Sequence, residues 1–132
     1  MSQPVSSFPS SPSLPSTPPP PRPRPATWNA AVRQIFRDQY AMMVRKQHDY
    51  GPGNIAAFGE LGVLVRLSDK FERLKHLLVT QDAAGRIVPR TDAPANESIE
   101  DSYRDLLNYA LIALMVRQGL WETPFDPEDT DF

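Results

Sequence analysis

The sequence contains no cysteine, only two histidines and no long apolar run. The absence of cysteine excludes a disulfide framework, a thiolate nucleophile and a cysteine-ligated zinc site. Two histidines are too few for most histidine-based metal sites. No stretch reaches the ~20 apolar residues of a membrane-spanning helix, and the N-terminus lacks the apolar core of a secretory signal. We therefore expect a cytoplasmic protein with no membrane partner.

The N-terminal segment differs in composition from the rest of the chain. Residues 1–26 hold ten of the fifteen prolines, interleaved with serine and two arginines. Such a segment has too few apolar side chains to offset the entropy of ordering, and its prolines favour extended polyproline II conformations. We predict a disordered tail over 1–26, which serves either as a plain spacer or as a ligand for an SH3-like or WW-like domain.

The remainder of the chain is acidic. Residues 27–132 carry 12 basic and 16 acidic side chains, a net charge of −4. A surface that binds duplex DNA normally shows a basic excess, so we expect no direct contact with duplex DNA. The length suits one domain. We place that domain at 27–121 and an acidic, solvated C-terminal tail at 122–132.

Apolar side chains recur at helical spacing in three segments, and no segment has a convincing strand pattern. The sequence Tyr50-Gly51-Pro52-Gly53-Asn54 separates the first two segments, because its glycines and proline interrupt a helix. Gly85, Pro89 and Pro94 mark a loop before the third. The predicted fold is all-α, a small bundle of three main helices, with expected bounds of 28–47, 59–79 and 96–119.

The apolar positions of each helix predict its buried face. The second half of the third helix is apolar nearly all round, which suggests that both of its sides are covered. Three helices of this length bury little alone, so we expect homo-oligomerisation, as a dimer or tetramer, to complete the bundle. The predicted core positions are Trp28, Val32, Ile35, Phe36, Met42 and Met43, then Leu64, Leu67, Phe71, Leu74 and Leu78, then Ile99, Tyr103, Leu106, Leu107, Ala110, Ala113 and Leu114.

An acidic stripe follows one side of the third helix. Glu97, Asp101, Asp105 and Asn108 are spaced by four and three residues, which keeps them within a sector of about 80°. Like charges four residues apart cost a helix a few tenths of a kcal/mol per pair. A divalent cation, opposing lysine and arginine side chains, or exposure to water would offset that cost.

Basic side chains on the first two helices provide possible partners for the stripe. Lys46 continues the apolar side of the first helix, either at the inner seam of the domain or as a lysine that extends from it to solvent. On the second helix, Asp69 has Arg66 three residues before it and Arg73 four residues after it. This group is either part of a site or an exposed patch of mutually paired charges.

The combination of these motifs resembles the nucleotide modification associated domain 1 family of phages and bacteria. The similarity covers about residues 40–118. The family is akin to the all-α nucleotide pyrophosphohydrolases of the MazG and dimeric dUTPase type, in which acidic pairs on two successive helices bind magnesium. The resemblance implies a role in phage or bacterial nucleotide chemistry. The motifs are Lys46 with Asp49-Tyr50-Gly51, then Arg66-x-x-Asp69-Lys70-x-x-Arg73-Leu74, then Glu97-Ser98-x-x-Asp101-x-x-x-Asp105-x-x-x-Tyr109.

The chain also departs from those enzymes. Its nearest matches to their acidic pairs are Asp69-x-x-Glu72 and Glu97-x-x-Glu100. On an ideal helix, Glu72 and Glu100 lie about 60° and about 100° off the faces that carry Asp69 and Asp101. The more coherent constellation is therefore Asp69 together with Glu97, Asp101 and Asp105.

The first functional hypothesis is a magnesium-dependent nucleoside triphosphate pyrophosphohydrolase. One or two Mg²⁺ or Mn²⁺ ions would bridge the phosphates of a nucleotide and activate a water molecule. Cationic side chains would neutralise the remaining phosphate charge, and His48 would carry a proton. The expected metal ligands are Asp69, Glu97, Asp101 and Asp105; the phosphate ligands are Lys46, Arg66, Lys70 and Arg73; the base or sugar contacts are Tyr50, Asn54 and Asn108.

The second hypothesis is a non-catalytic nucleotide-binding or dimerisation module. In this case Asp101 and Asp105 pair with Arg66 and Arg73 across adjacent helices, and the charges serve the fold rather than a metal. The residues alone leave both hypotheses open.

Overall fold

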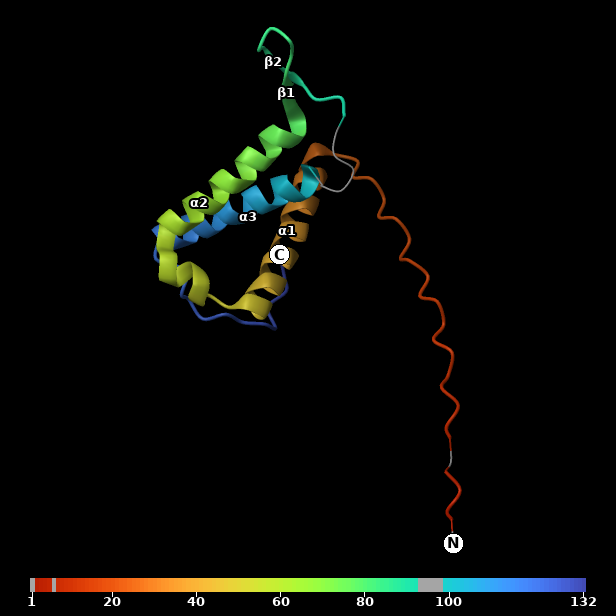
Figure 1. The fold of residues 1–132 in the computed structure, drawn as a ribbon. Helices are drawn as coiled ribbons and strands as arrows, with labels where there is room; N and C mark the ends of the chain where they lie inside the picture. Colours follow the sequence, from red (N-terminus) through yellow and green to blue (C-terminus); the bar gives the residue numbers. More distant parts are fainter. Residues whose placement is uncertain (1, 6, 93–98) are drawn as a thin grey trace.

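The computed structural model describes residues 2–5, 7–92 and 99–132. Within these residues the chain forms three long helices and a two-stranded hairpin (Figure 1). The expectation of a mostly helical fold is confirmed, and the small hairpin lies in the segment that was expected to be a loop with at most a short extended piece at Arg86-Ile87-Val88. The elements are α1 Trp28–Tyr50, α2 Gly53–Leu78, β1 Val79–Gln81, β2 Ile87–Pro89 and α3 Ile99–Arg117.

Helix α1 has clear signals at both ends. The side chain of Thr27 accepts a hydrogen bond from the backbone N–H of Ala30 at 3.1 Å, as an N-cap should. The helix continues through Tyr50, one turn further than predicted, because no residue before Gly51 interrupts it. Gly51 has φ 65° and its N–H donates to the carbonyl of Gln47 at 2.9 Å, which closes the helix.

Helix α2 has a kink at Gly59. The backbone there has φ 62° and ψ −157°, a region that is essentially reserved for glycine. Residues 53–58 form a short helical stretch before the kink, which the sequence did not predict. The long straight part of α2 begins after Gly59, where the second helix was expected to start.

The hairpin interrupts what was predicted to be a loop. Strands β1 and β2 pair antiparallel, with Thr80 opposite Val88, and project beyond the helices (Figure 1). The Asp82 carboxylate closes the turn by accepting hydrogen bonds from the backbone N–H of Ala84 and of Arg86, each at 2.9 Å. The backbone N–H of Arg86 contributes most to holding the pKa of Asp82 below its usual value.

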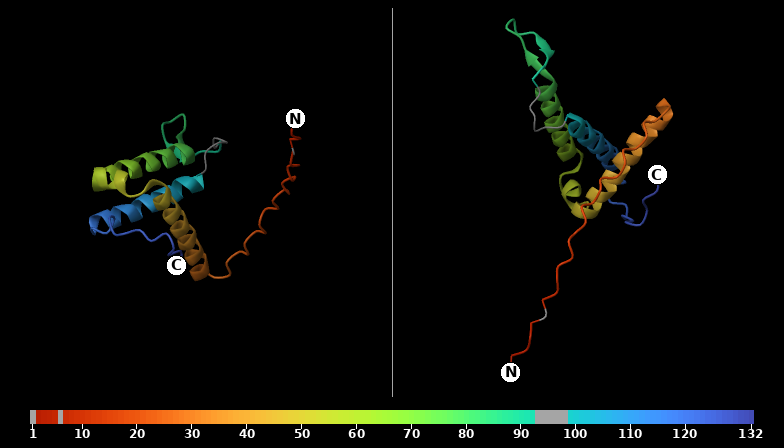
Figure 2. Two further views of the ribbon diagram at one scale, coloured as in Figure 1. Left: turned by 90° about the horizontal axis from the view of Figure 1, so that it is seen from below. Right: turned by 90° about the vertical axis from the view of Figure 1, so that its right-hand side faces the viewer.

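The three helices form two layers. Helices α2 and α3 lie side by side and run in opposite directions, and α1 crosses one side of this pair (Figure 2). Three apolar side chains are buried among the described residues, namely Val63, Leu74 and Leu77, all on α2. The buried side chains contributed by α1 and α3 are polar: Gln39, Ser102 and Asn108.

Many of the predicted core positions are exposed in the single chain. On α2, Leu64 is 58% exposed and Phe71 is 57% exposed. On α3, Tyr103 and Leu114 are each 54% exposed. Trp28, Ile35 and Phe36 of α1 are exposed as well. For an isolated chain the predicted inner faces were therefore wrong at these positions, because the polar side of α3, rather than its apolar side, faces α1.

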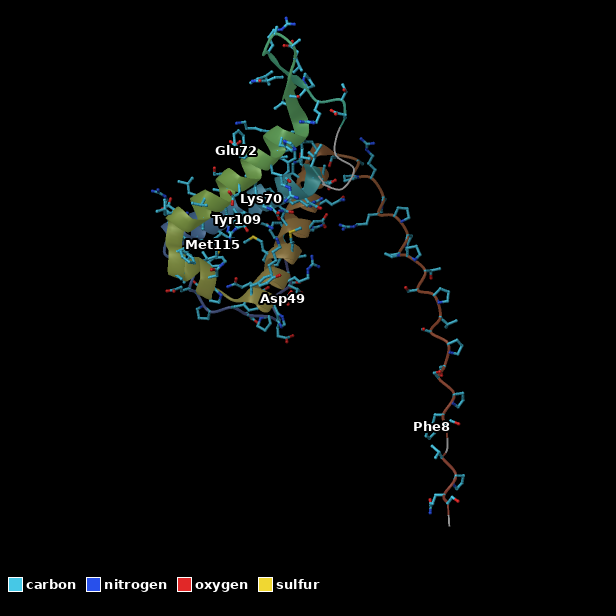
Figure 3. The ribbon with its side chains drawn as sticks, viewed as in Figure 1. Phe8, Asp49, Lys70, Glu72, Tyr109 and Met115 are labelled. Carbon is cyan, nitrogen blue, oxygen red and sulfur yellow. The ribbon has the colours of Figure 1, made fainter. Side chains whose placement is uncertain are left out.

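The two terminal segments behave differently. The described part of residues 1–26 extends away from the helices, with Phe8 far from them, and Arg22 pairs with Asp38 at 2.8 Å (Figure 3). Disorder of this segment stays a prediction. Residues 122–132 are exposed, as expected for a solvated tail, but Phe132 stacks on Phe36 with ring centroids 6.2 Å apart. The C-terminal segment thus contacts α1.

In the part of the chain that the structure covers, no helix combines the length and hydrophobicity needed to cross a bilayer.

Gly59→Ala tests the origin of the kink. No atom lies within 4 Å of a Cβ placed at Gly59 or at Gly53, so neither alanine would clash. Of these two glycines only Gly59 has a positive φ, and we expect G59A to lower the free energy of unfolding by about 1–3 kcal/mol. G53A, in ordinary helical backbone, should be neutral or stabilising by about 0.5 kcal/mol. Urea unfolding followed by circular dichroism measures both, and equal effects would contradict this reading of the kink.

Candidate functional site

The inner side of α3 carries a carboxylate shared by two lysines. Asp105 lies between α1 and α2, and its side chain is 24% exposed. One carboxylate oxygen is 3.5 Å from Nζ of Lys46, and the other is 2.8 Å from Nζ of Lys70. We call Lys46, Asp105 and Lys70 the lysine–aspartate cluster. It joins all three helices.

The spacing of residues along each helix explains how these side chains meet. Lys70 is seven residues after Val63 and seven before Leu77, two of the buried residues of α2, so it shares their face. Lys46 follows the apolar side of α1, as the sequence suggested. The lysines therefore reach Asp105 from the two helices that flank α3.

The surroundings of Asp105 act on its pKa in opposite directions. Partial burial of the carboxyl raises its pKa, since burial disfavours the charged form. The hydrogen bond from Lys70 and the positive charges of Lys46 and Lys70 together outweigh burial, and the pKa of Asp105 is lowered from its usual value. The carboxylate is thus ionised at neutral pH, and the cluster carries two positive charges and one negative charge.

A buried amide network lies one turn further along α3. Gln39 and Asn108 are 3% and 4% exposed, and Nε2 of Gln39 donates to Oδ1 of Asn108 at 3.1 Å. The same nitrogen donates to the carbonyl of Arg104 at 2.9 Å, while Nη1 of Arg104 donates to Oε1 of Gln39 at 3.2 Å. Nδ2 of Asn108 donates to the sulfur of Met42 at 3.1 Å. We call Gln39, Arg104 and Asn108 the amide network.

Both ends of the Asn108 amide are engaged by α1. Its expected contact with a base or sugar stays a prediction. Gln39 and Arg104 were not among the predicted site residues. Gln39 falls at helical spacing among the apolar residues of α1, and a polar residue in that position was the available signal.

The predicted metal ligands do not gather in the described part of the chain. Asp69 and Asp101 are exposed, Asp101 engages another group, and Glu97 lies outside the described residues. Among the residues that the structure describes, no group of three histidine, cysteine, aspartate or glutamate side chains could hold a metal ion. The four-carboxylate magnesium site stays a prediction.

The other predicted site residues lie at varying distances from the cluster along the chain. Arg66 and Arg73 are exposed on α2, and Arg73 engages another group. Tyr50 is 81% exposed at the end of α1, and Asn54 is exposed at the start of α2. Figure 3 shows Asp49 near the end of α1 and Lys70 on the middle of α2.

His48 belongs to a different part of the surface. Its Nδ1 is 3.4 Å from a carboxylate oxygen of Asp49, and its side chain is exposed. It lines a cavity of about 250 Å³ together with Tyr40, Val44 and Phe125, between α1 and the C-terminal segment. Nothing in its recorded contacts connects it to the lysine–aspartate cluster, and its role as a proton carrier stays a prediction.

The ion pairs of Asp105 differ from those anticipated, whereas the expected pairing of Asp101 stays a prediction. Asp105 was expected to pair with Arg66 or Arg73, and instead it pairs with lysines.

No protein-family model, curated protein or solved structure matches this chain. The similarity to the nucleotide modification associated domain 1 family is thus untested, and a function has to be argued from the geometry.

Removal of the Asn108 amide tests the network. We expect Asn108→Ala to lower the free energy of unfolding by about 1–3 kcal/mol, because Gln39 loses a buried partner. Gln39→Ala should have an effect of similar size. The double variant should cost less than the sum of the two, with a coupling of roughly 1 kcal/mol. Strict additivity in urea unfolding would show that the two amides do not interact.

The pH dependence of stability tests the charge on Asp105. A lowered pKa in the folded state means that the carboxylate stabilises the fold above the unfolded pKa of about 3.9, and that this contribution disappears as the pH falls through the folded value. Asp105→Asn should therefore lose about 1–3 kcal/mol at pH 7, and the same amount at pH 5. Below pH 4 the difference between wild type and D105N should shrink. A difference that does not change with pH would contradict this assignment.

Proposed function

We propose that this chain binds a nucleotide through its phosphate groups at the lysine–aspartate cluster. The observation that carries the proposal is that two lysines converge on a single carboxylate. One carboxylate neutralises one of them, and the cluster retains a net positive charge that an anionic ligand would compensate. Lysine is a common phosphate ligand that acts as a point charge.

The exposure of the two lysines suits an exchangeable ligand. Lys46 is 51% exposed and its contact with Asp105 is long, at 3.5 Å, so it can turn toward a ligand at small cost. Lys70 is 23% exposed and held at 2.8 Å, which gives it a defined position. Arg66 lies one turn before Lys70 on the same side of α2, and would widen the cationic surface for a second phosphate.

A nucleotide, rather than another phosphate compound, is proposed because of the family resemblance. The motifs around Lys46, Lys70 and Asp105 are part of that resemblance, which implies phage or bacterial nucleotide metabolism. The exposed Tyr50 is the last residue of α1 and the exposed Asn54 is in the first turn of α2, on either side of the turn that joins the helices, where they would contact a base or sugar.

A hydrolase would need a bound metal ion, and the contacts that Asp105 makes do not favour one. Both oxygens of Asp105 accept contacts from lysines, and a magnesium ion there would have to displace these cations. We therefore derive no magnesium-dependent step, and the binding-module hypothesis is the better supported of the two. Formation of pyrophosphate or monophosphate from a nucleoside triphosphate in the presence of Mg²⁺ or Mn²⁺ would restore the hydrolase hypothesis.

We also propose that the chain is a homo-oligomer. Supporting this, the described residues bury three apolar side chains and leave many large ones exposed. A domain with so small an apolar core is marginal as a monomer.

Ligand titration of charge variants tests the nucleotide proposal. Calorimetry with a panel of nucleoside triphosphates and with pyrophosphate should detect binding, and Lys70→Gln should weaken it about tenfold or more, since a tenfold loss corresponds to about 1.4 kcal/mol. Lys75→Gln is the matched control, because Lys75 is an exposed lysine of the same helix that pairs with Glu72. It should change little.

Asp105→Asn separates phosphate binding from metal-dependent binding. It removes the carboxylate that the two lysines share, so phosphate affinity should be kept or increased. A magnesium-bridged nucleotide would instead lose its ligand and its affinity. Absence of binding by the wild type would overturn the proposal.

A further inference from the structure

The side of the α2–α3 pair that faces away from α1 is apolar and exposed to solvent in the single chain. We call it the outer face and define it by Leu61, Leu64 and Phe71 of α2 with Tyr103, Leu107 and Leu114 of α3. Their exposed fractions range from 39% for Leu107 to 72% for Leu61. On α3 these positions lie about 180° from Asp105, and on α2 about 130° from Lys70. The outer face and the lysine–aspartate cluster thus occupy opposite sides of one helix pair.

The outer face contains a shallow apolar cavity of about 350 Å³ along the seam between the two helices. Leu61, Leu64, Leu67 and Ala113 line it, with Glu60 at its edge. A cavity with such walls accepts an aliphatic side chain from a partner. Contiguous apolar patches of this kind are rare on stable monomers and mark interaction surfaces.

Among the described residues, the charged side chains that border the outer face lie at its two ends. Arg117 pairs with Glu60 at 2.8 Å at one end, and Lys75 pairs with Glu72 at 3.2 Å at the other. Nζ of Lys75 also lies 5.8 Å from the centre of the Phe71 ring. Each end is neutral, so two copies can approach along this face without repulsion between like charges.

We infer that a second copy of this chain covers the outer face. An apolar surface with neutral ion pairs at both ends is self-complementary, and a two-fold axis places the same surface of each copy against the other. Helices α2 and α3 of both copies then form a four-helix layer, with α1 of each copy on the outside. This interface goes beyond the proposed nucleotide site and does not depend on it.

Sedimentation of the full chain tests the inference. At micromolar concentrations the wild type should have a mass of roughly 30 kDa, twice the 14.8 kDa of one chain. Leu64→Asp places a charge in the centre of the outer face, and should give a species of one-chain mass. Leu64 is 58% exposed in the single chain, so the helical content of L64D should remain. Ile87→Asp is the control, because Ile87 is 74% exposed on the hairpin, and it should leave the dimer intact.

A cross-linking experiment avoids any loss of stability. The chain has no cysteine, so a single Leu64→Cys substitution provides one thiol per copy. A short bis-maleimide should join L64C into dimers at low protein concentration, and should leave Ile87→Cys largely uncoupled. Cross-linking of both variants to the same low extent, or a wild type of one-chain mass at all concentrations, would overturn the inference.

The nucleotide titration distinguishes this inference from the proposed function. L64D should bind pyrophosphate as the wild type does, because its substitution lies on the opposite side of the helix pair from Lys46 and Lys70. A dimeric wild type that binds no nucleotide would refute the nucleotide proposal alone. A monomeric wild type that binds nucleotide would refute the interface and the proposed homo-oligomer, and would leave the nucleotide proposal standing.

Discussion

The arrangement of the three helices depends on how α3 satisfies the polar groups of its inner side. Asp105 accepts Lys46 from α1 and Lys70 from α2, and one turn further on Asn108 exchanges hydrogen bonds with α1. These contacts hold α1 against the pair formed by α2 and α3, and the fully buried side chains that α1 and α3 contribute among the described residues are polar. A polar interior of this kind is stable only while every buried group keeps its partner. The position of α1 is therefore more sensitive to loss of one amide or one charge than the position of α2 is.

The same requirement bears on function. A carboxylate shared by two lysines is a structural contact and also a cationic site, and the two roles constrain each other. Anion binding at Lys46 would weaken its long contact with Asp105 without breaking the shorter contact with Lys70. Under the proposed function, α2 and α3 would therefore stay joined while a phosphate binds. A divalent cation at Asp105 would compete with both lysines at once, whereas an anion would compete only for the long contact of Lys46. Anion binding is therefore the better supported proposal.

Much of this architecture could be predicted from the sequence, although the partners of each residue could not. Helical periodicity located the long helices, and the glycines and proline of the 50–54 turn located the break. The position of Lys46 on the apolar side of α1 left open whether it reaches inward or to solvent, and in the structure it is half exposed and 3.5 Å from Asp105. Helical periodicity shows that α3 has an apolar side and a polar side, but it does not show which side packs against α1. The prediction that the apolar side with Tyr103 and Leu114 is buried in the single chain was therefore wrong. The Asp82 turn was missed because its strands are three residues each.

The exposed outer face and the polar inner side are two consequences of one constraint. If α3 turned its apolar side toward α1, Asp105 and Asn108 would face solvent. Asp105 would then lose its contacts with the two lysines, and a hydrogen bond between the Gln39 and Asn108 amides would add little to stability in water. The chain buries its polar stripe with specific partners and leaves its apolar stripe outside, where an isolated copy has nothing to place against it. In an isolated chain this choice costs hydrophobic stabilisation, and only a second apolar surface can recover it. The proposed second copy would supply that surface through its own α2–α3 face, and the lysine–aspartate cluster would stay accessible on the other side.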